Sequence, residues 1–343
     1  MSQRTEAKAE RVTERIIAAD IGATKTLIGI FEGPPGSPQE VVAERLENAA
    51  HPDFGDLLSD FLQRHGAADV DAACIAFPGP VDDGRAQGTN IAWAVDRRDL
   101  AAQLGTARVQ VVNDLVAAAR GMLLLPETAF MALNPGADAA ASGNAAVLSV
   151  GTGLGQAILH WDEDRFRPIA CEGSHADFAA QSEQEIALLR YMQARHGTHV
   201  SWERVVSGPG LVDIHAFLRD GAADGPGAPV AAAGGDDPAA AISAAALQGG
   251  DPLCRAAVTL FCRLMGAEAG NLALKCLAVG GVYIGGGIPP QILPALQDGA
   301  FLSGFREKGR FRGLMSRIPV RVALEPRAGL LGAARIATGL PTA

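Results

Sequence analysis

The sequence lacks paired cysteines, a long apolar run and a surplus of basic residues. Its five cysteines (Cys74, Cys171, Cys254, Cys262 and Cys276) are odd in number and form no Cys-x-x-Cys pair, which disfavours a disulfide framework and a zinc knuckle. Nowhere do 18 uncharged apolar residues run together, and the charged N-terminal segment has no apolar signal-peptide core. We therefore expect a cytoplasmic protein with no membrane partner.

The lack of a surplus of basic residues limits which partners the protein can bind. The chain carries 38 acidic and 29 basic side chains, a formal net charge of −9, so its average surface repels phosphate backbones and anionic lipid. We expect no nucleic-acid partner. An acidic protein can still bind a nucleotide, but it must use local devices such as glycine turns, helix N-termini and Mg²⁺.

Length and composition indicate two soluble domains. The 343 residues are 48% hydrophobic and 20% charged, as in ordinary globular chains. A single core usually stops growing near ~250 to 300 residues, so this chain is long enough for two. Glycine is in surplus at 41 residues, about 12% against a usual ~7%, and much of the surplus follows apolar, β-like runs.

Strand-like runs and helical periodicities alternate in an α/β order. The predicted strands are 16–20, 26–31, 39–47, 72–78, 108–112, 145–150, 156–161, 282–284 and 320–324. The predicted helices are 54–65, 115–125, 182–197, 208–220, 252–277 and 329–337. Two hairpins, each closed by a glycine-bearing turn, suggest two related α/β domains. A Gly/Ala/Pro-rich surface loop is predicted over 221–237.

The first glycine cluster closes the first hairpin. Backbone N–H groups and the Thr24 hydroxyl could contact phosphate oxygens there, and Asp20 could hold Mg²⁺ through a water. A plain tight hairpin explains this motif equally well, and an exposed lysine at a turn is more often solvated than bound. The candidate nucleotide-binding residues are Asp20, Gly22, Ala23, Thr24 and Lys25.

Two more glycine clusters follow later strands. The second repeats the hairpin layout of the first, and two such turns are stronger evidence for a phosphate cradle than one. The third lies at a strand end, where the backbone could approach a ligand such as an adenine ring, although an isolated glycine triplet is more often a flexible turn. The candidate residues are Gly151, Thr152, Gly153, Gly285, Gly286 and Gly287.

Four side chains are candidates for substrate chemistry. Asp114 follows a predicted strand, where the carboxylates of α/β proteins often face a ligand crevice. Its alternative role is a helix N-cap, and the two roles are compatible. Glu172, His175 and Glu203 form a polar set suited to ring hydroxyls, because carboxylates accept hydrogen bonds and a neutral imidazole can donate one. From spacing alone, His175 would be a structural histidine.

Together the motifs resemble the bacterial glucokinase family, within the actin-like ATPase and sugar-kinase superfamily. The matching segments, in order from about residue 16 to 337, are AADIGATKT, IAFPGPV, TNIAW, VVNDLVAAA, VGTGLGQAIL, CEGSHADFA, EQEIALLRYM, WERVVSGPGL, YIGGGI, EKGRF and RAGLLGAA. The resemblance implies two actin-like ATPase (ribonuclease H-like) α/β domains with an interdomain cleft for sugar. It implies a small domain of 1–112 with the returning C-terminal segment 327–343, and a large domain of 113–326.

The resemblance also implies roles for individual residues. Asp114 matches the catalytic base that takes the proton of the glucose 6-hydroxyl as that oxygen attacks the γ-phosphoryl group of ATP. The matching substrate ligands are Asn90, Asn113, Asp114, Glu172, His175 and Glu203. The three glycine turns match the nucleotide contacts. The implied function is ATP- and Mg²⁺-dependent glucose phosphorylation feeding glycolysis, and a homodimer is common in the family.

Two positions depart from the family pattern. Ala23 stands where a second glycine is usual. A methyl group there would cost on the order of 1 kcal/mol or more, and lower nucleotide affinity, if the turn required a positive φ or close approach to a phosphate. Ser174 replaces the second glycine of Glu-Gly-Gly-His and could shift the sugar preference. Two alternatives stay open: a kinase for fructose, mannose or an amino sugar, and a non-catalytic sugar sensor on the same fold.

Overall fold

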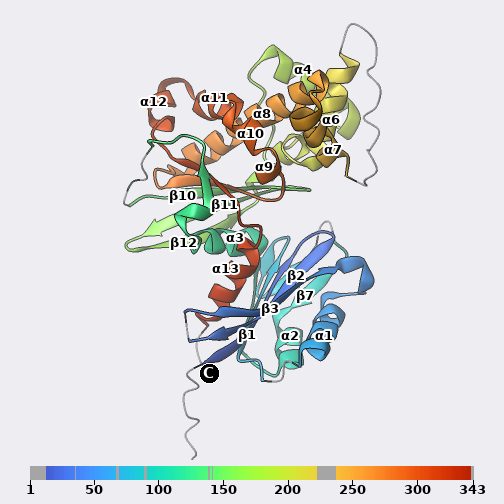
Figure 1. Cartoon of the computed structure of the whole chain (residues 1–343), viewed down its shortest axis with the longest axis vertical. Coiled ribbons are helices and arrows are strands. Elements are labelled where there is room, and N and C mark those ends of the chain that lie inside the picture. The colour runs from blue at the N-terminus through green and yellow to red at the C-terminus, as the bar shows by residue number, and fades with distance from the viewer. Residues whose placement is uncertain are drawn as a thin grey trace, which may run out of the picture. The chain divides into compact units, whose positions relative to one another are not determined.

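The computed structural model describes residues 13–34, 36–66, 69–88, 91–137, 140, 142–221 and 237–340. The chain forms two compact units, shown in Figure 1: unit 1 is Met1–Leu124 with Arg327–Ala343, and unit 2 is Leu125–Pro326. No helix in these described ranges is long and apolar enough to cross a membrane. The predicted loop 221–237, apart from its two end residues, and the candidate sugar ligand Asn90 lie outside the described residues.

Unit 1 is built on a five-stranded sheet in the order β3-β2-β1-β4-β8. The strands are β1 Glu14–Ile21, β2 Lys25–Gly33, β3 Gln39–Glu47, β4 Ala72–Phe77 and β8 Val109–Asn113. The first three form an antiparallel meander, and β4 and β8 run parallel to β1. Between β4 and β8 in the sequence, the chain forms a second, small sheet of three strands. These are β5 Val81–Asp82, β6 Arg85–Gln87 and β7 Ala94–Asp96.

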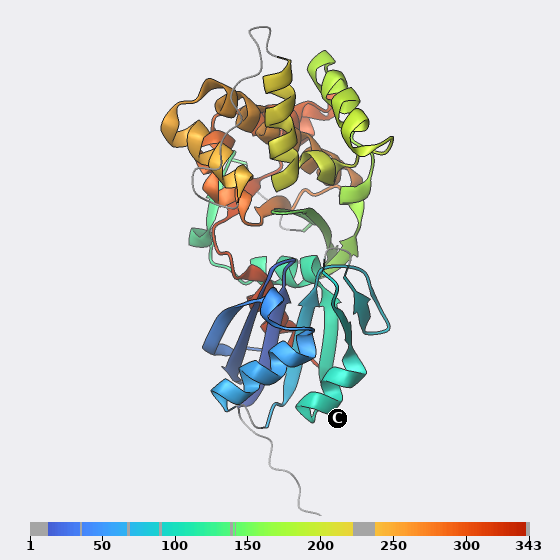
Figure 2. The ribbon, with the colours of Figure 1, turned by 90° about the vertical axis from the view of Figure 1, so that its right-hand side faces the viewer.

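Helices cover both faces of this sheet (Figure 2). On one face, α1 (Phe54–His65) and α2 (Arg97–Leu104) pack on alternate side chains of the strands. On the other face, α3 (Asp114–Met122) and α13 (Ala328–Ala337) pack on the intervening ones. Asp53 caps α1 by accepting the Asp56 N–H, and Gly66 ends it at φ 61°, so local chemistry sets the helix bounds.

Helices α3 and α13 approach each other backbone to backbone. A Cβ at Gly121 would overlap the Ala328 carbonyl, and a Cβ at Gly332 would overlap the Ala117 carbonyl. This close packing fixes α3 to unit 1. Unit 1 accordingly runs to Leu124 and resumes at Arg327. The family resemblance implied 1–112 with 327–343, so the returning segment begins at the same residue, and α3 belongs to unit 1.

Unit 2 is built on a six-stranded sheet in the order β12-β11-β10-β13-β14-β9. The strands are β9 Phe130–Ala132, β10 Ala145–Val150, β11 Leu154–Asp162, β12 Arg165–Cys171, β13 Gly281–Gly285 and β14 Val320–Ala323. Here too an antiparallel meander, β10 to β12, is extended by two strands parallel to its first member. The two sheets share this topology, so the prediction of two related α/β domains is confirmed.

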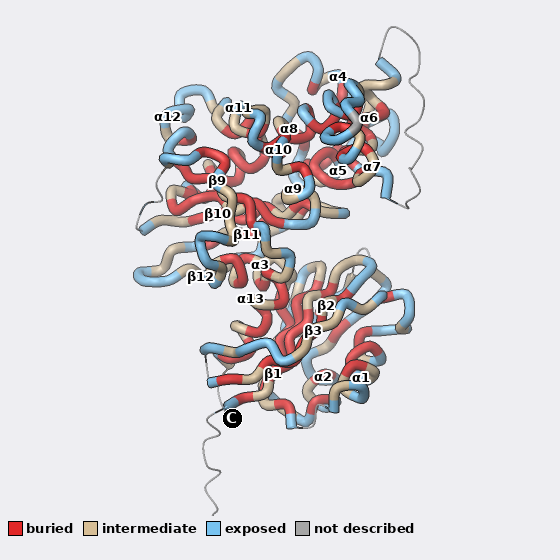
Figure 3. Tube along the Cα trace, in the orientation of Figure 1, coloured by how far each residue is buried: buried red, intermediate tan, exposed pale blue. Residues whose placement is uncertain are grey.

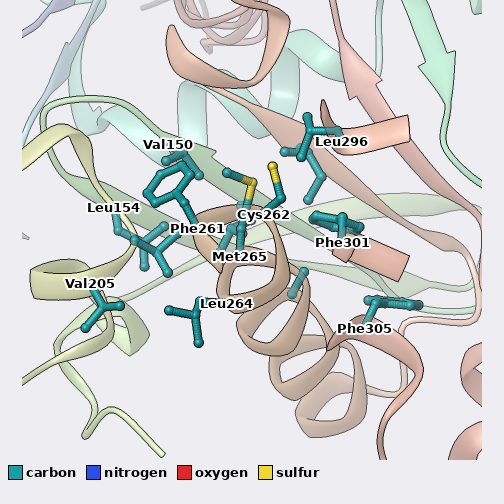
Figure 4. Close-up of a cluster of buried hydrophobic side chains, with 14 of the residues drawn as sticks. Val150, Leu154, Val205, Phe261, Cys262, Leu264, Met265, Leu296, Phe301 and Phe305 are labelled. Atoms are coloured by element: carbon teal, nitrogen blue, oxygen red, sulfur yellow. The ribbon is translucent and has the colours of Figure 1, made fainter. Parts of the chain in front are cut away.

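The core of unit 2 centres on the helix α8 (Pro252–Cys276), which is buried along most of its length (Figure 3). Figure 4 shows its side chains Phe261 and Met265 between residues of the sheet and of neighbouring helices. The other helices of eight or more residues are α4 Glu183–His196 and α6 Gly208–Asp220. Shorter ones are α5 Trp202–Val205, α7 Pro238–Ala244, α9 Ile288–Gln291, α10 Leu293–Gln297, α11 Ala300–Arg306 and α12 Arg312–Met315.

Most predicted elements occur within a residue or two of their expected bounds. The strand 39–47 and the helices 54–65 and 208–220 match β3, α1 and α6 at both ends. The predicted helix 115–125 is displaced, because α3 begins at Asp114 and ends at Met122. The edge strand β12 was missed, since its sequence RFRPIAC carries charges and a proline, which are typical protection for an exposed sheet edge.

Candidate active site

In unit 1, the first glycine turn joins β1 to β2, and a buried asparagine is hydrogen-bonded to it. The Gly22 N–H donates to the Lys25 carbonyl at 2.9 Å and closes the turn. Asn48, which was not among the predicted site residues, donates from Nδ2 to the Gly22 carbonyl at 2.9 Å and accepts from Thr26 Oγ1 at 2.8 Å. A polar residue directly after a predicted strand was the only signal for it.

The alanine in this turn carries no left-handed strain. In the described part of the chain, the non-glycine residues with positive φ are Asp69, Asp83, Glu163 and Leu277, so Ala23 is not one of them. The expected cost of a methyl group at a positive φ therefore does not arise, whereas the cost for close approach to a phosphate stays a prediction.

Two side chains of the turn face outward. Thr24 and Lys25 are exposed, and Lys25 Nζ pairs with Glu47 Oε1 at 3.0 Å. An exposed ion pair of this kind is worth roughly 0–1 kcal/mol, so Lys25 can leave it at little cost. Its phosphate contact, like that of Thr24, stays a prediction.

Asp20 is the last residue but one of β1, and its carboxylate lies against the first turn of α13. A Cβ at Gly329 would overlap Asp20 Oδ2, so a glycine at this position makes room for the carboxylate near the helix N-terminus, where a negative charge is favoured. Burial nevertheless raises the pKa of Asp20 to about 6, with Arg45 opposing the shift. The sequence motif RAGLLGAA contains Gly329, but only the structure shows that the lack of a side chain there makes room for the Asp20 carboxylate.

We expect Asp20→Asn to stabilise the metal-free protein more at pH 8 than at pH 5. The folded-state pKa of about 6 exceeds the ordinary 3.8, so the stabilisation that comes from binding this proton is complete at low pH and is lost as pH rises through about 6. At pH 8 the wild type alone bears a buried carboxylate. The measurement is the difference in Tm between variant and wild type at both pH values, without Mg²⁺ or nucleotide. A difference independent of pH would contradict the raised pKa.

The end of β8 presents Asn113 and Asp114. Asn113 caps α3: its Oδ1 accepts the Leu115 N–H at 3.0 Å, and its Nδ2 donates to the Gly79 carbonyl of the Pro-Gly-Pro turn at 3.2 Å. Asp114 is the first helical residue, and its Oδ1 accepts the same Leu115 N–H at 2.9 Å. The capping alternative proposed for Asp114 therefore belongs to Asn113, and the helix start fixes the Asp114 backbone.

In unit 2, the second glycine turn is tied to two other segments. The Gly151 N–H donates to the Gly153 carbonyl at 2.9 Å, and the Gly208 N–H, at the start of α6, donates to the Gly151 carbonyl at 2.8 Å. Glu203 Oε2 accepts the Leu154 N–H at 3.0 Å. A Cβ at Gly153 would lie 2.7 Å from that oxygen, so the turn must pass close to the carboxylate.

Three predicted sugar ligands gather beside this turn. His175 Nε2 lies 3.7 Å from Glu172 Oε2, and His175 Nδ1 lies 3.9 Å from Glu203 Oε1. These distances exceed hydrogen-bonding range, so the polar atoms stay available to a ligand. Glu172 and His175 are exposed, whereas Glu203 is half-buried. Residues distant in the sequence thus form one polar cluster, and the ligand role of His175 stays a prediction.

The third glycine turn lies against the second. Gly286 has φ 91°, and a Cβ there would overlap the backbone of Val150, the last residue of β10. Gly286 and Gly287 are exposed, and Gly285 is buried at the end of β13. The packing places both turns of unit 2 at adjacent strand ends, because β10 and β13 are parallel neighbours.

Among the residues that the structure describes, no group of three or more His, Cys, Asp or Glu side chains is placed to hold a metal ion. A single carboxylate such as Asp20, beside a turn that could hold phosphate, suits Mg²⁺, which keeps several waters and is usually bound through phosphates and one or two carboxylates.

Comparison with known proteins covers both units. The glucokinase family model matches residues 17–340. A glucokinase from Synechocystis sp. is 39% identical, with 93% of this chain and 96% of that protein aligned. One from Nostoc punctiforme is 38% identical, at 95% and 99%. The crystal structure of a glucokinase from an Antarctic psychrotroph has a TM-score of 0.79 and 27% identity, covering 94% of this chain and 98% of that one. The prediction of two actin-like ATPase domains is confirmed.

Proposed function

Because this chain belongs to the glucokinase family, we propose that it transfers the γ-phosphoryl group of ATP to the 6-hydroxyl of D-glucose, giving glucose 6-phosphate and ADP. The observation that carries the proposal is the polar cluster of Glu172, His175 and Glu203 on the second glycine turn. The cluster supplies acceptors for sugar hydroxyls, and the turn supplies a backbone suited to phosphate. The Glu203 carboxylate belongs to the cluster and also accepts a backbone N–H of the turn.

The sugar-binding role follows from the chemistry of this cluster. The carboxylates of Glu172 and Glu203 accept hydrogen bonds from hydroxyls, and the imidazole of His175 can donate one. Ser174 lies between these ligands but is buried, with an exposed fraction of 3%. Its side chain therefore points away from solvent, and glucose remains the proposed sugar.

Asp114 is the proposed catalytic base. It would take the proton of the 6-hydroxyl as that oxygen attacks phosphorus, while the leaving ADP takes the electrons of the broken bond. A positioned base contributes roughly 10²–10⁴-fold, and alignment and charge stabilisation supply most of the remaining acceleration in phosphoryl transfer. Asn113 remains a proposed sugar ligand through the hydrogen-bonding capacity that its capping role leaves over.

ATP is proposed to bind at the three glycine turns, with Asp20 contacting Mg²⁺ through water. Bound Mg²⁺ would neutralise the phosphate charge. The backbone N–H groups of the turns can receive phosphate oxygens without a basic surface, which fits a chain of net charge −9. Thr24 and Thr152, both exposed, add hydroxyl donors.

An activity matrix tests the proposal. Glucose, fructose, mannose and glucosamine are each assayed with ATP, ADP and polyphosphate, with and without Mg²⁺. We expect the highest kcat/KM for glucose with ATP and Mg²⁺, because a site built to bind a hydroxyl can reject a sugar that lacks it by roughly 10⁴ or more. A preference for another hexose would replace glucose. Calorimetric sugar binding without ADP production would favour the sensor alternative.

The cytoplasm is the proposed location. All five cysteines are free thiols, and Cys74, Cys254, Cys262 and Cys276 are buried, as suits a reducing compartment. We also propose a homodimer, as implied by the family resemblance, and light scattering of the purified protein measures its mass directly.

A further inference from the structure

A buried polar network lies beneath the loop that carries two proposed sugar ligands. Gln156 follows the second glycine turn on β11 and is 1% exposed. Its Nε2 donates to Glu268 Oε1 on α8 at 2.8 Å. Glu268 is fully buried, and its Oε2 accepts from Asn271 Nδ2 at 2.9 Å. Both carboxylate oxygens of Glu268 therefore act as acceptors.

The network continues to a lysine near the surface. Lys308 Nζ donates to Asn271 Oδ1 at 2.7 Å and to the Ala267 carbonyl at 2.8 Å. Burial lowers the pKa of Lys308 and raises the pKa of Glu268, and each charge opposes the shift of the other. Lys308 belongs to the segment EKGRF, to which the proposed reaction gives no role.

At its other end the network contacts the sugar loop. A Cβ at Gly173 would overlap Gln156 Oε1, so the loop backbone rests directly on the Gln156 amide between Glu172 and His175. That oxygen is buried and has no hydrogen-bond partner among the described residues. Gln156 also pairs with Cys171 across the β11–β12 ladder, which fixes the strand that leads into the loop.

Stability does not explain a buried carboxylate here. Desolvating Glu268 and the polar atoms around it is costly, and apolar residues of similar volume often stabilise a core at least as well. What these hydrogen bonds provide instead is one fixed side-chain arrangement around Glu268, because each bonded donor and acceptor restricts its neighbour.

We propose that Gln156 and Glu268 are positioning residues for sugar recognition. The bond to Glu268 holds the Gln156 amide in one position, and the amide in turn sets the position of the backbone at Gly173. The side chains on either side of Gly173, Glu172 and His175, are thereby positioned for the sugar. The inference rests on the proposed glucose site and deepens it. It predicts that damage to the network weakens sugar binding before it weakens nucleotide binding.

The test is Gln156→Leu, which keeps the volume but removes the bond to Glu268. We expect the KM for glucose to rise about tenfold, the free-energy equivalent of one buried hydrogen bond, with the KM for ATP and kcat within about twofold. The matched control is Asn134→Leu, which removes another buried amide of unit 2, bonded to the Ile318 carbonyl and the Val320 N–H. The control should lower Tm without raising the glucose KM selectively.

A second measurement applies if Gln156→Leu folds poorly. Gly173→Ala should raise the glucose KM, because its methyl group displaces the loop from Gln156. In a Gln156→Ala background the same change should cost several-fold less, since the obstructing amide is gone. Independent effects that multiply, or equal rises in both KM values, would overturn the positioning role. If the wild type itself fails to phosphorylate glucose, the proposed function fails, and calorimetry of sugar binding by these variants still decides the inference.

Discussion

Asp114→Asn lowers kcat by at least about 10²-fold and leaves glucose binding within a few-fold. The substitution preserves shape, and an asparagine oxygen can still accept the Leu115 N–H that Asp114 Oδ1 accepts at 2.9 Å. What it removes is basicity, because a neutral amide cannot take the proton from an attacking hydroxyl. Loss of rate with retained binding is therefore the signature of a base, not of a cap.

The measurement pairs steady-state kinetics with calorimetry of glucose binding. Asp53→Asn is the matched control in unit 1: Asp53 caps α1 by accepting the Asp56 N–H, and asparagine caps about as well as aspartate. The control should retain wild-type kcat. Turnover of Asp114→Asn within a few-fold of wild type would remove Asp114 from the chemistry.

The sequence predicted the turns of this site well, because their chemistry is local. A glycine cluster between two apolar runs indicates a closed hairpin wherever the rest of the chain lies, and both hairpins were found within a few residues. The same reasoning placed Asp114 at a strand end. The sequence could not show which of Asn113 and Asp114 caps α3. The cap is the residue just before the helix, so identifying it requires the helix start to be known to a single residue.

Contacts between distant segments could not be predicted. Asn48 supports the first turn across β2 and β3, Gly329 accommodates Asp20 from the other end of the chain, and Gln156 meets Glu268 through a buried bond. Each contact depends on packing between elements far apart in the sequence. The attachment of α3 to unit 1 is a contact of the same kind, since the glycine contacts between α3 and α13 leave no periodic signal.

Among the contacts between distant segments, the one made by Glu203 has the largest functional consequence. The sequence predicted it as a sugar ligand only, yet its Oε2 also accepts the Leu154 N–H at the end of the second glycine turn, at 3.0 Å. The other oxygen, Oε1, lies 3.9 Å from His175 Nδ1 and faces the polar cluster. One side chain therefore connects the proposed sugar site to the proposed phosphate site within unit 2.

Two variants separate these roles. Glu203→Gln can keep one carbonyl oxygen on the Leu154 N–H, but it then turns an NH₂ group toward the sugar, so we expect kcat/KM for glucose to fall roughly 10²-fold with little change in the ATP KM. Glu203→Ala removes both contacts and leaves the Leu154 N–H without its acceptor. We expect a fall of roughly 10³-fold or more, together with a higher ATP KM.

The exposed Glu183 in the first turn of α4 supplies the control, Glu183→Gln, which should leave all constants unchanged. The decisive quantity is the ATP KM. If Glu203→Ala raised only the glucose KM, the turn would hold its shape without the carboxylate, and Glu203 would be a sugar ligand alone. A rise in the ATP KM for alanine and not for glutamine assigns the second role to the single hydrogen bond at Leu154, because that bond is what distinguishes the two variants at the turn.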